Sequence, residues 1–195
     1  TVHDGSNTAN ISISGINSDY FSSDDVTLLA GRRLTSDDNT GKKKVIMISD
    51  KVVDQIFDGD SQKALSQKIQ VEIDGIYYQY YVVGVYKYES NNSFSSSSDE
   101  DITTTAYIPI LTGKAQTHSN EGYQQFTVVT KSGIDSVSTF ATQIENFFAP
   151  YYSSNEDYKV STTTMESMTE SMSDMIGTVS IAISFIAGIS LLVGG

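Results

Sequence analysis

The last 21 residues of the chain, from 175 to 195, contain no charged side chain. As a helix, such a segment spans about 30 Å, which is the thickness of the hydrocarbon core of a bilayer. Ser180, Ser184 and Gly188 recur at every fourth position and form a small-residue face of the kind that lets membrane helices approach closely. A buried core helix is the alternative, but such helices are usually shorter. The sequence therefore predicts that residues 176–195 are the start of a transmembrane helix.

An amphipathic segment precedes this apolar run. Thr163 and Glu166 have the spacing of a capping box, which predicts a helix that starts near residue 164. Five apolar residues then follow with the alternating spacing of three and four that is typical of a heptad seam. They are Met165, Met168, Met172, Met175 and Val179. We interpret residues 163–175 as a stalk helix that transmits motion, although the seam could simply pack against the domain or a sister helix.

Charge and composition exclude several classes of function. Twenty-four acidic and twelve basic residues give a net charge of -12, which repels nucleic-acid phosphates and anionic lipid headgroups. We therefore expect no nucleic-acid partner, whereas a cationic ligand stays open. The chain has no cysteine, so disulfides, thiolate metal sites and cysteine nucleophiles are excluded. The first five residues lack the basic and apolar regions of a signal peptide, so we expect a portion of a longer chain.

No catalytic or metal-binding constellation can be assembled from the sequence. The two histidines, His3 and His118, lack the neighbours of a zinc site. The acidic runs at residues 58–60 and 99–101 do not continue into a calcium-binding loop. No nucleophile elbow and no phosphate-binding glycine loop are present. We therefore predict a protein that is not an enzyme and that has no metal or cofactor.

The chain before the stalk has the pattern of an α+β domain. Alternating or continuous apolar runs predict strands. These runs cover residues 10–14, 26–29, 44–49, 68–73, 76–88, 103–111, 125–130 and 158–161. Gly15 is expected to end the first strand, and the pair Asp74 and Gly75 predicts a hairpin turn.

Helices and one loop separate these strands. Asp50 is predicted to cap a short helix, and Asp135 is predicted to open a second helix that ends at Pro150. Residues 89–101 are rich in serine and acidic side chains, and this composition favours a loop. The loop contains one aromatic residue, Phe94, which is a candidate for docking a partner.

Four tyrosines follow the predicted hairpin turn. Strand alternation places Tyr78 and Tyr80 on one face and Tyr77 and Tyr81 on the other. An exposed aromatic platform at Tyr78 and Tyr80 would be a second candidate for partner docking. Cross-strand packing within the domain is the alternative.

Two neighbouring motifs carry a resemblance to a known family. Gly-Ile-Asn-Ser-Asp-Tyr-Phe at residues 15–21 and Leu-Leu-Ala-Gly-Arg-Arg-Leu-Thr-Ser-Asp-Asp at residues 28–38 resemble a run in the MacB-like periplasmic core domain of ABC transporter permeases. The matching motif residues are Gly15, Tyr20, Phe21, Gly31, Arg32 and Asp38. Arg32 and Arg33 could bind an anionic partner, but an ion pair beside a turn is the simpler interpretation. Ser66 stands where the family usually has a glycine.

The resemblance extends in order over nearly the whole chain and implies a two-lobed extracytoplasmic domain at residues 1–162. A mostly β Sabre-like lobe would cover about residues 16–112, and residues 113–160 would form part of an α/β Porter-like lobe. Relatives are dimeric permeases of the cell membrane that work with a cytoplasmic ABC ATPase and often dock an adaptor protein. The resemblance therefore implies a homodimer, a membrane, an ATPase and an adaptor as partners.

Three hypotheses for function follow. The first is a domain that couples ATP-driven motion through the stalk to efflux of peptides, toxins or lipoproteins. The second is an extracellular domain similar to that of FtsX, which binds and activates a cell-wall hydrolase. The third is a sensor domain for cationic antimicrobial peptides, which the net charge of -12 would attract. We favour the first hypothesis.

Overall fold

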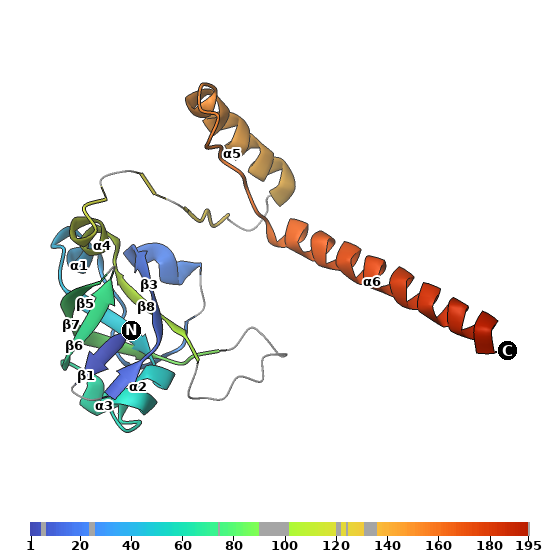
Figure 1. Ribbon diagram of the computed structural model, residues 1–195. Coiled ribbons are helices and arrows are strands. Elements are labelled where there is room, and N and C mark those ends of the chain that lie inside the picture. The colour runs from blue at the N-terminus through green and yellow to red at the C-terminus, as the bar shows by residue number, and fades with distance from the viewer. Residues whose placement is uncertain are drawn as a thin grey trace. The chain divides into compact units, whose positions relative to one another are not determined.

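The computed structural model describes residues 1–4, 7–23, 26–73, 75–89, 102–119, 122–123, 125–130 and 136–194. The chain divides into two units, Thr1–Thr127 and Val128–Gly195. The first unit contains a β-sheet with short helices, and the second contains two longer helices (Figure 1).

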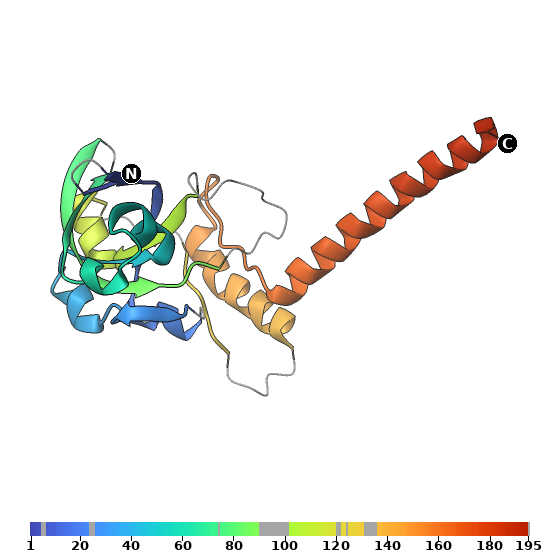
Figure 2. The same ribbon diagram turned by 90° about the horizontal axis from the view of Figure 1, so that it is seen from below.

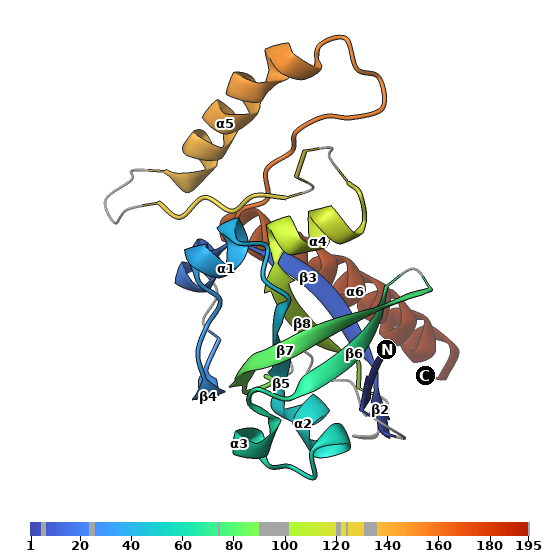
Figure 3. The ribbon, with the colours of Figure 1, turned by 90° about the vertical axis from the view of Figure 1, so that its left-hand side faces the viewer.

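A mixed sheet of eight strands forms the first unit (Figure 3). Its strands are β1 (Val2–Asp4), β2 (Asn7–Ala9), β3 (Ile11–Ile16), β4 (Leu28–Gly31), β5 (Val45–Ser49), β6 (Lys68–Ile73), β7 (Ile76–Tyr86) and β8 (Thr104–Pro109). Their order is β2-β1-β6-β7-β5-β8-β3, and β4 pairs with β7 outside this order. The β5–β7 and β3–β8 pairs are parallel, and the other pairs are antiparallel.

Apolar side chains pack on both faces of the sheet. The short helices of this unit are η1 (Ser18–Ser22), α1 (Ser36–Thr40), α2 (Asp50–Ile56), α3 (Ser61–Ala64) and α4 (Ile110–Gln116). Ile46 and Ile48 of β5 join the core that α2 and α3 cover, whereas Val45 and Met47 join a second core with Phe21 of η1. Because β5 is buried on both faces, its sequence is continuously apolar, as expected for a central strand.

The β6–β7 hairpin and the central strand β5 form where the sequence predicts them. The prediction that Gly15 ends its strand is wrong. Gly15 pairs with Ile108, and β3 continues to Ile16. A Cβ atom on Gly15 would lie 3.2 Å from the Cα of Ile110 in α4. The glycine at this position therefore permits close packing of a helix rather than a turn.

The predicted helix after β5 is present, but its cap is Ser49 rather than Asp50. The Ser49 hydroxyl accepts a hydrogen bond from the Val52 N–H at 3.2 Å, and it lies 2.7 Å from the Thr104 hydroxyl. Asp50 is the first helical residue instead, and its carboxylate accepts a hydrogen bond from the Tyr88 N–H at 2.9 Å. Asp50 therefore ties the end of β7 to α2.

Two predicted strands are wrong. Residues 125–130 and 158–161 form no strand in the part of the chain that the structure describes. An alternating apolar sequence becomes a strand only where a neighbouring strand satisfies its backbone hydrogen bonds. Neither segment is among the paired strands of the described sheet, and Val129 and Tyr158 are exposed.

The first helix of the second unit is α5 (Val137–Tyr152), which is capped by Ser136 through a hydrogen bond from the Thr139 N–H. The predicted start at Asp135 lies outside the described residues. Pro150 lies inside α5 and does not end it. Its missing N–H removes a single helical bond close to the terminus, and two further residues complete the turn.

One continuous helix, α6 (Met165–Gly194), runs through most of the residues predicted for the stalk helix and for the apolar segment after it (Figure 2). Its cap differs by one residue from the prediction. The Thr164 hydroxyl accepts a hydrogen bond from the Ser167 N–H at 3.0 Å, and the Ser167 hydroxyl oxygen accepts one from the Thr164 N–H at 3.1 Å. Glu166 does not take part in the cap of α6. Its carboxylate accepts a hydrogen bond from the Ser138 hydroxyl of α5 instead.

The predicted membrane segment at residues 176–195 is not shown. Among the helices of the described residues, none is both long and apolar enough to cross a membrane. Gly195 and the side chains of residues 182 and 187–194 lie outside the described part of the chain.

Candidate functional site

The Gly31–Arg32 motif lies at the end of β4, which pairs antiparallel with β7. Gly31 has a φ of +76°, and a Cβ atom there would lie 2.3 Å from the Val83 carbonyl oxygen. A Cβ atom on Gly84 would lie 2.3 Å from the Arg32 carbonyl oxygen. The Arg32 N–H donates to the Val83 carbonyl at 2.8 Å. Two glycines are therefore needed for these backbones to approach, and the Arg32 side chain reaches Asp38 of α1.

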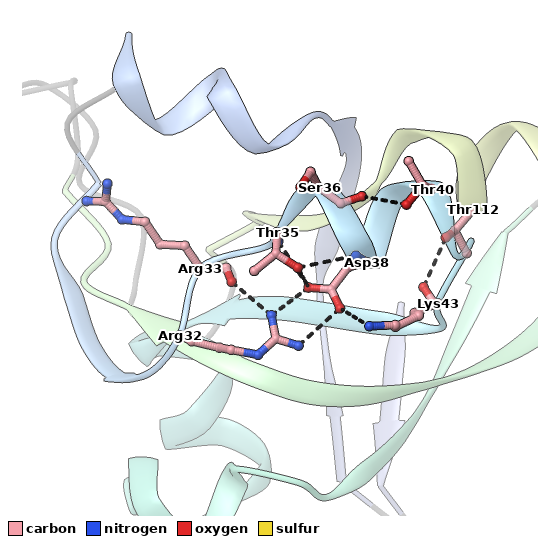
Figure 4. A network of polar contacts seen from close by, with 8 residues as sticks. All are labelled: Arg32, Arg33, Thr35, Ser36, Asp38, Thr40, Lys43 and Thr112. Carbon is pink, nitrogen blue, oxygen red and sulfur yellow. Dashed lines mark hydrogen bonds and ion pairs between the residues drawn. The ribbon is translucent and has the colours of Figure 1, made fainter.

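Asp38 accepts hydrogen bonds from three residues (Figure 4). The Arg32 guanidinium binds both carboxylate oxygens, at 2.5 and 3.1 Å, and Lys43 Nζ lies 3.3 Å from Oδ1. Thr35 donates from its backbone N–H at 3.0 Å and from its hydroxyl at 2.9 Å. The Asp38 N–H donates back to the Thr35 hydroxyl, which completes the capping box of α1.

This network keeps the Asp38 carboxylate ionised. Burial alone would raise its pKa, but the hydrogen bonds from Arg32, Thr35 and Lys43 outweigh burial and hold the pKa well below its ordinary value of 3.8. The side chain is fully buried, and its oxygens already accept several hydrogen bonds. Arg32 thus forms an ion pair beside a turn, which was the simpler of its two interpretations, and the motif fixes the path of the chain from β4 to β5.

The neighbouring arginine and the aromatic motif residues are also structural. Arg33 donates to the Val26 carbonyl at 2.9 Å, and its guanidinium carbon lies 5.4 Å from the centre of the Phe21 ring. The rings that meet beneath it are those of Tyr20, Phe21, Tyr86 and Tyr107. These side chains pack in or against the second core, so the aromatic residues of the motif stabilise the fold.

The tyrosine face predicted for docking packs against α4 instead. Tyr80 is fully buried and donates its hydroxyl proton to the Gln116 side-chain oxygen, while the Tyr78 hydroxyl donates to the Gln116 carbonyl at 3.1 Å. Burial raises the pKa of Tyr80 to about 12. Tyr80 is therefore excluded as a docking residue, and Tyr78 is half-buried. Phe94, the third candidate, lies outside the described residues.

The heptad seam of α6 is exposed along its whole length. The exposed fractions run from 51% at Met168 to 78% at Met165. Acidic side chains lie on the opposite face of the same part of the helix, because each residue turns an α-helix by about 100°. They are Glu166, Glu170 and Asp174. The seam is therefore an apolar stripe that the described chain does not cover.

A contact that the sequence gave no signal for joins α5 to the segment before α6. Glu145 Oε1 accepts hydrogen bonds from the Thr162 N–H at 2.6 Å and from its hydroxyl at 2.8 Å. These two bonds lower the pKa of Glu145. Neither Glu145 nor Thr162 stands in a recognisable sequence motif, so only the structure reveals this contact.

The position at which the family usually has glycine is strained in this chain. Ser66 has a φ of +63°, in the left-handed region that non-glycine residues rarely adopt. Its N–H donates to the Val82 carbonyl at 2.8 Å, so the backbone must take this path to enter β6. Within the described residues, no group of three or more His, Cys, Asp or Glu side chains is placed to hold a metal ion.

Two comparisons of sequence place the chain among known proteins. The profile of the MacB-like periplasmic core domain matches residues 1–147. An uncharacterized ABC transporter permease, YvrN of Bacillus subtilis (strain 168), is 33% identical over 96 residues. These residues are 49% of this chain and only 22% of that permease.

Solved structures share the fold. The extracellular domain of the noncanonical ABC-type transporter YknZ from Gram-positive bacteria matches with a TM-score of 0.61 and 22% identity, over 83% of this chain and 75% of that one. The periplasmic region of MacB from Actinobacillus actinomycetemcomitans matches with a TM-score of 0.51 and 16% identity, over 72% of this chain and 56% of that one. The chain therefore belongs to the family of MacB-like periplasmic core domains.

Proposed function

We propose that this chain is the extracytoplasmic domain of an ABC transporter permease and that it passes motion between membrane helices and an adaptor protein or a substrate. The observation that carries the proposal is the exposed heptad seam on one uninterrupted helix, α6. Family membership supports the permease setting. In this setting the domain lies on the outer side of the cell membrane, and a cytoplasmic ATPase supplies the energy.

Helix α6 has the properties of a mechanical element. Thirty residues of α-helix extend for about 45 Å, and no proline or cap interrupts them. The amino-terminal end of α6 is tied to α5 by the contact of Glu166 with Ser138. The contact of Glu145 with Thr162 holds the preceding segment on the same helix. A displacement of α6 is therefore passed to α5 through two polar contacts.

The seam supplies a surface for a partner helix. A run of exposed methionines adapts to the shape of whatever packs against it, because the side chain is unbranched and flexible. In the complete permease, we expect the covering helix to belong to the same subunit or to the second subunit of a homodimer. The transported cargo would be a peptide, a toxin or a lipoprotein, by resemblance to other members of the family.

The test is a charge placed in the seam of the full-length permease. The double variant Met168→Asp and Met172→Asp should abolish transport, because a packed seam cannot bury two carboxylates. The double variant Ser171→Asp and Ser173→Asp is the matched control, since it adds the same two side chains to the same helix outside the seam. Transport at the wild-type level by the double variant would overturn the proposal.

A crosslinking experiment identifies the partner of the domain. A photoreactive residue at Tyr77, which is exposed on β7, should capture an envelope protein of the adaptor class in intact cells. Capture of a peptidoglycan hydrolase and of no adaptor would overturn the transport proposal in favour of a domain similar to that of FtsX. The same residue placed at buried Tyr80 should capture nothing and is the control.

A further inference from the structure

Strand β3 leaves one edge of the sheet without a neighbouring strand. It is the last strand in the order of the sheet, and its six residues pair with β8 in an unbroken parallel register (Figure 3). Among the described residues, no other strand pairs with β3. In a parallel pair, the N–H and C=O groups of alternate residues point to the partner, and those of the residues between point away. Half of the backbone groups of β3 therefore face the free edge.

The free edge of β3 lacks the features by which proteins usually block an added strand. Edge strands are commonly very short, bulged, or guarded by proline or charged side chains. β2, at the opposite end of the sheet, has only three residues. β3 is twice as long, shows no register shift against β8, and contains neither proline nor a charged residue. Its edge is therefore open to β-augmentation, in which an extended chain binds as a further strand.

The side chains of β3 indicate which kind of chain fits beside it. Ile11 and Ile13 pack against the core that α2 and α3 cover, but both are only half-buried, because the sheet ends beside them. Ser12 and Ser14 alternate with them and lie on the other face. An added strand with apolar residues beside the isoleucines would complete their burial. Polar residues beside the serines would keep their hydrogen bonds with water, so an alternating apolar and polar segment fits.

Charge favours a peptide at this edge over a second copy of the chain. The net charge of -12 repels another copy and attracts a basic peptide. β3 itself carries no charge, so no like-charged side chain on it opposes the approach of a ligand backbone. Main-chain hydrogen bonds supply the affinity in β-augmentation and do not depend on the ligand sequence. The edge therefore suits ligands of varied sequence that share an extended form.

We propose that the free edge of β3 binds an extended segment of the transported cargo as an additional strand. The substrate class is then a basic peptide, or an unfolded segment of a polypeptide, in which apolar and polar residues alternate. This inference rests on the transport role proposed above, from which it takes the existence of a cargo. It adds where the cargo binds and which property of the cargo is recognised.

Hydrogen exchange of the backbone amides of the complete chain, followed by NMR, tests the inference. The probe is the terminally blocked peptide Lys-Thr-Val-Thr-Val-Thr-Lys, which alternates and has basic ends. We expect a saturable loss of exchange at the N–H groups of β3 that point away from β8. No change is expected in β6, which already has β1 and β7 on its two sides.

A modified peptide is the control for strand pairing. The same peptide with N-methyl groups on two neighbouring central residues has lost a hydrogen-bond donor on each of its edges, so it should protect no amide of β3. Equal protection by the two peptides would refute strand addition. Protection that rises with protein concentration in the absence of peptide would assign the edge to a second copy of the chain and overturn the proposal.

Substitution locates the binding site. Ser12→Lys puts a charge at the free edge, whereas Gln70→Lys puts the same charge on β6, between two strands. Both residues are exposed, so the fold accommodates either lysine. Only Ser12→Lys should lose peptide binding, because an edge lysine opposes strand addition and repels the basic peptide. Unchanged affinity in Ser12→Lys would refute the site.

The binding assay requires no transport, so the two proposals fail separately. If β3 binds no peptide but charges in the seam of α6 abolish transport, the edge site is wrong and the transport role stands. If β3 binds the peptide but the seam variant transports at the wild-type level, the edge site stands as a peptide-binding site and the mechanical role of α6 is wrong.

Discussion

Asp38 offers the sharpest test of how the family motif works. The perturbations are Asp38→Asn, which keeps the shape and removes the charge, and Asp38→Ala, which also removes the acceptor. The control is Asp37→Asn, because Asp37 lies in the same first turn of α1 and is exposed. If the motif is structural, only the substitutions at Asp38 should lower the free energy of unfolding by more than about 0.5 kcal/mol.

The size of the effect follows from the partners of the carboxylate. Hydrogen bonds to a charged group contribute about 1.5–3 kcal/mol each when buried. Arg32 and Lys43 are about half exposed, so water compensates part of their loss. We therefore expect Asp38→Asn to cost about 1–2 kcal/mol. Asp38→Ala should cost about 1 kcal/mol more, since it also removes the partner of the Thr35 N–H and the capping box.

The pH dependence gives an independent signature. The pKa of Asp38 is lower in the folded chain than its ordinary value of 3.8, so the ionised carboxylate stabilises the fold above that value. This contribution is lost as pH falls from 3.8 toward the folded pKa. The stability difference between the parent chain and Asp38→Asn should therefore be constant above about pH 5 and shrink below about pH 4.

Urea unfolding followed by tyrosine fluorescence measures these differences, because the chain has twelve tyrosines and no tryptophan. The reasoning would be refuted if Asp38→Asn were as stable as the parent chain at pH 7. It would also be refuted if Asp37→Asn cost as much as Asp38→Asn, or if the difference stayed constant down to pH 3.

Three further predictions concern other positions. Ser66→Gly should raise the free energy of unfolding by about 0.5–1 kcal/mol, because it relieves the positive φ, whereas Ser66→Ala should bring no gain. Gly84→Ala should lower the free energy of unfolding by more than about 3 kcal/mol in the same urea assay, since the new Cβ would clash with the Arg32 carbonyl oxygen. Glu145→Gln should speed hydrogen exchange of the Thr162 N–H at pH 7. In the parent chain the pKa of Glu145 is lowered, so the carboxylate stays ionised at pH 4.5, its ordinary pKa. The Thr162 N–H should therefore lose its protection from exchange only below pH 4.5.

The strands of the first unit could be predicted because local signals and tertiary packing agree there. β5 is apolar at each position because it is buried on both faces. The turn before β7 has Gly75 at a φ of +78°, a conformation that its sequence favours. Residues 125–130 have an equally good strand pattern and form none. The pattern alone does not say whether a neighbouring strand is available to pair with it.

The candidate sites, too, depend on distant segments that the local sequence does not reveal. Arg32 could be interpreted as one half of an ion pair from its place beside a turn, but Lys43 and Thr35 became partners of Asp38 only through the fold. Tyr78 and Tyr80 were correctly placed on one face of a strand, and only α4 determined that this face is covered. Strand alternation gives the direction of a side chain, whereas burial depends on distant segments.

The pairing of β3 with β8 has a consequence for how the chain is made. Ser12 and Thr105 face each other across this pair although they are 93 residues apart in sequence. At a synthesis rate of about 5–20 residues per second, β3 waits for roughly 5–20 seconds before its neighbour exists. Its sequence, Ile-Ser-Ile-Ser-Gly-Ile, is uncharged and alternates like an aggregation-prone segment. We therefore expect β3 of the nascent chain to be prone to self-association until β8, which ends at residue 109, has been made.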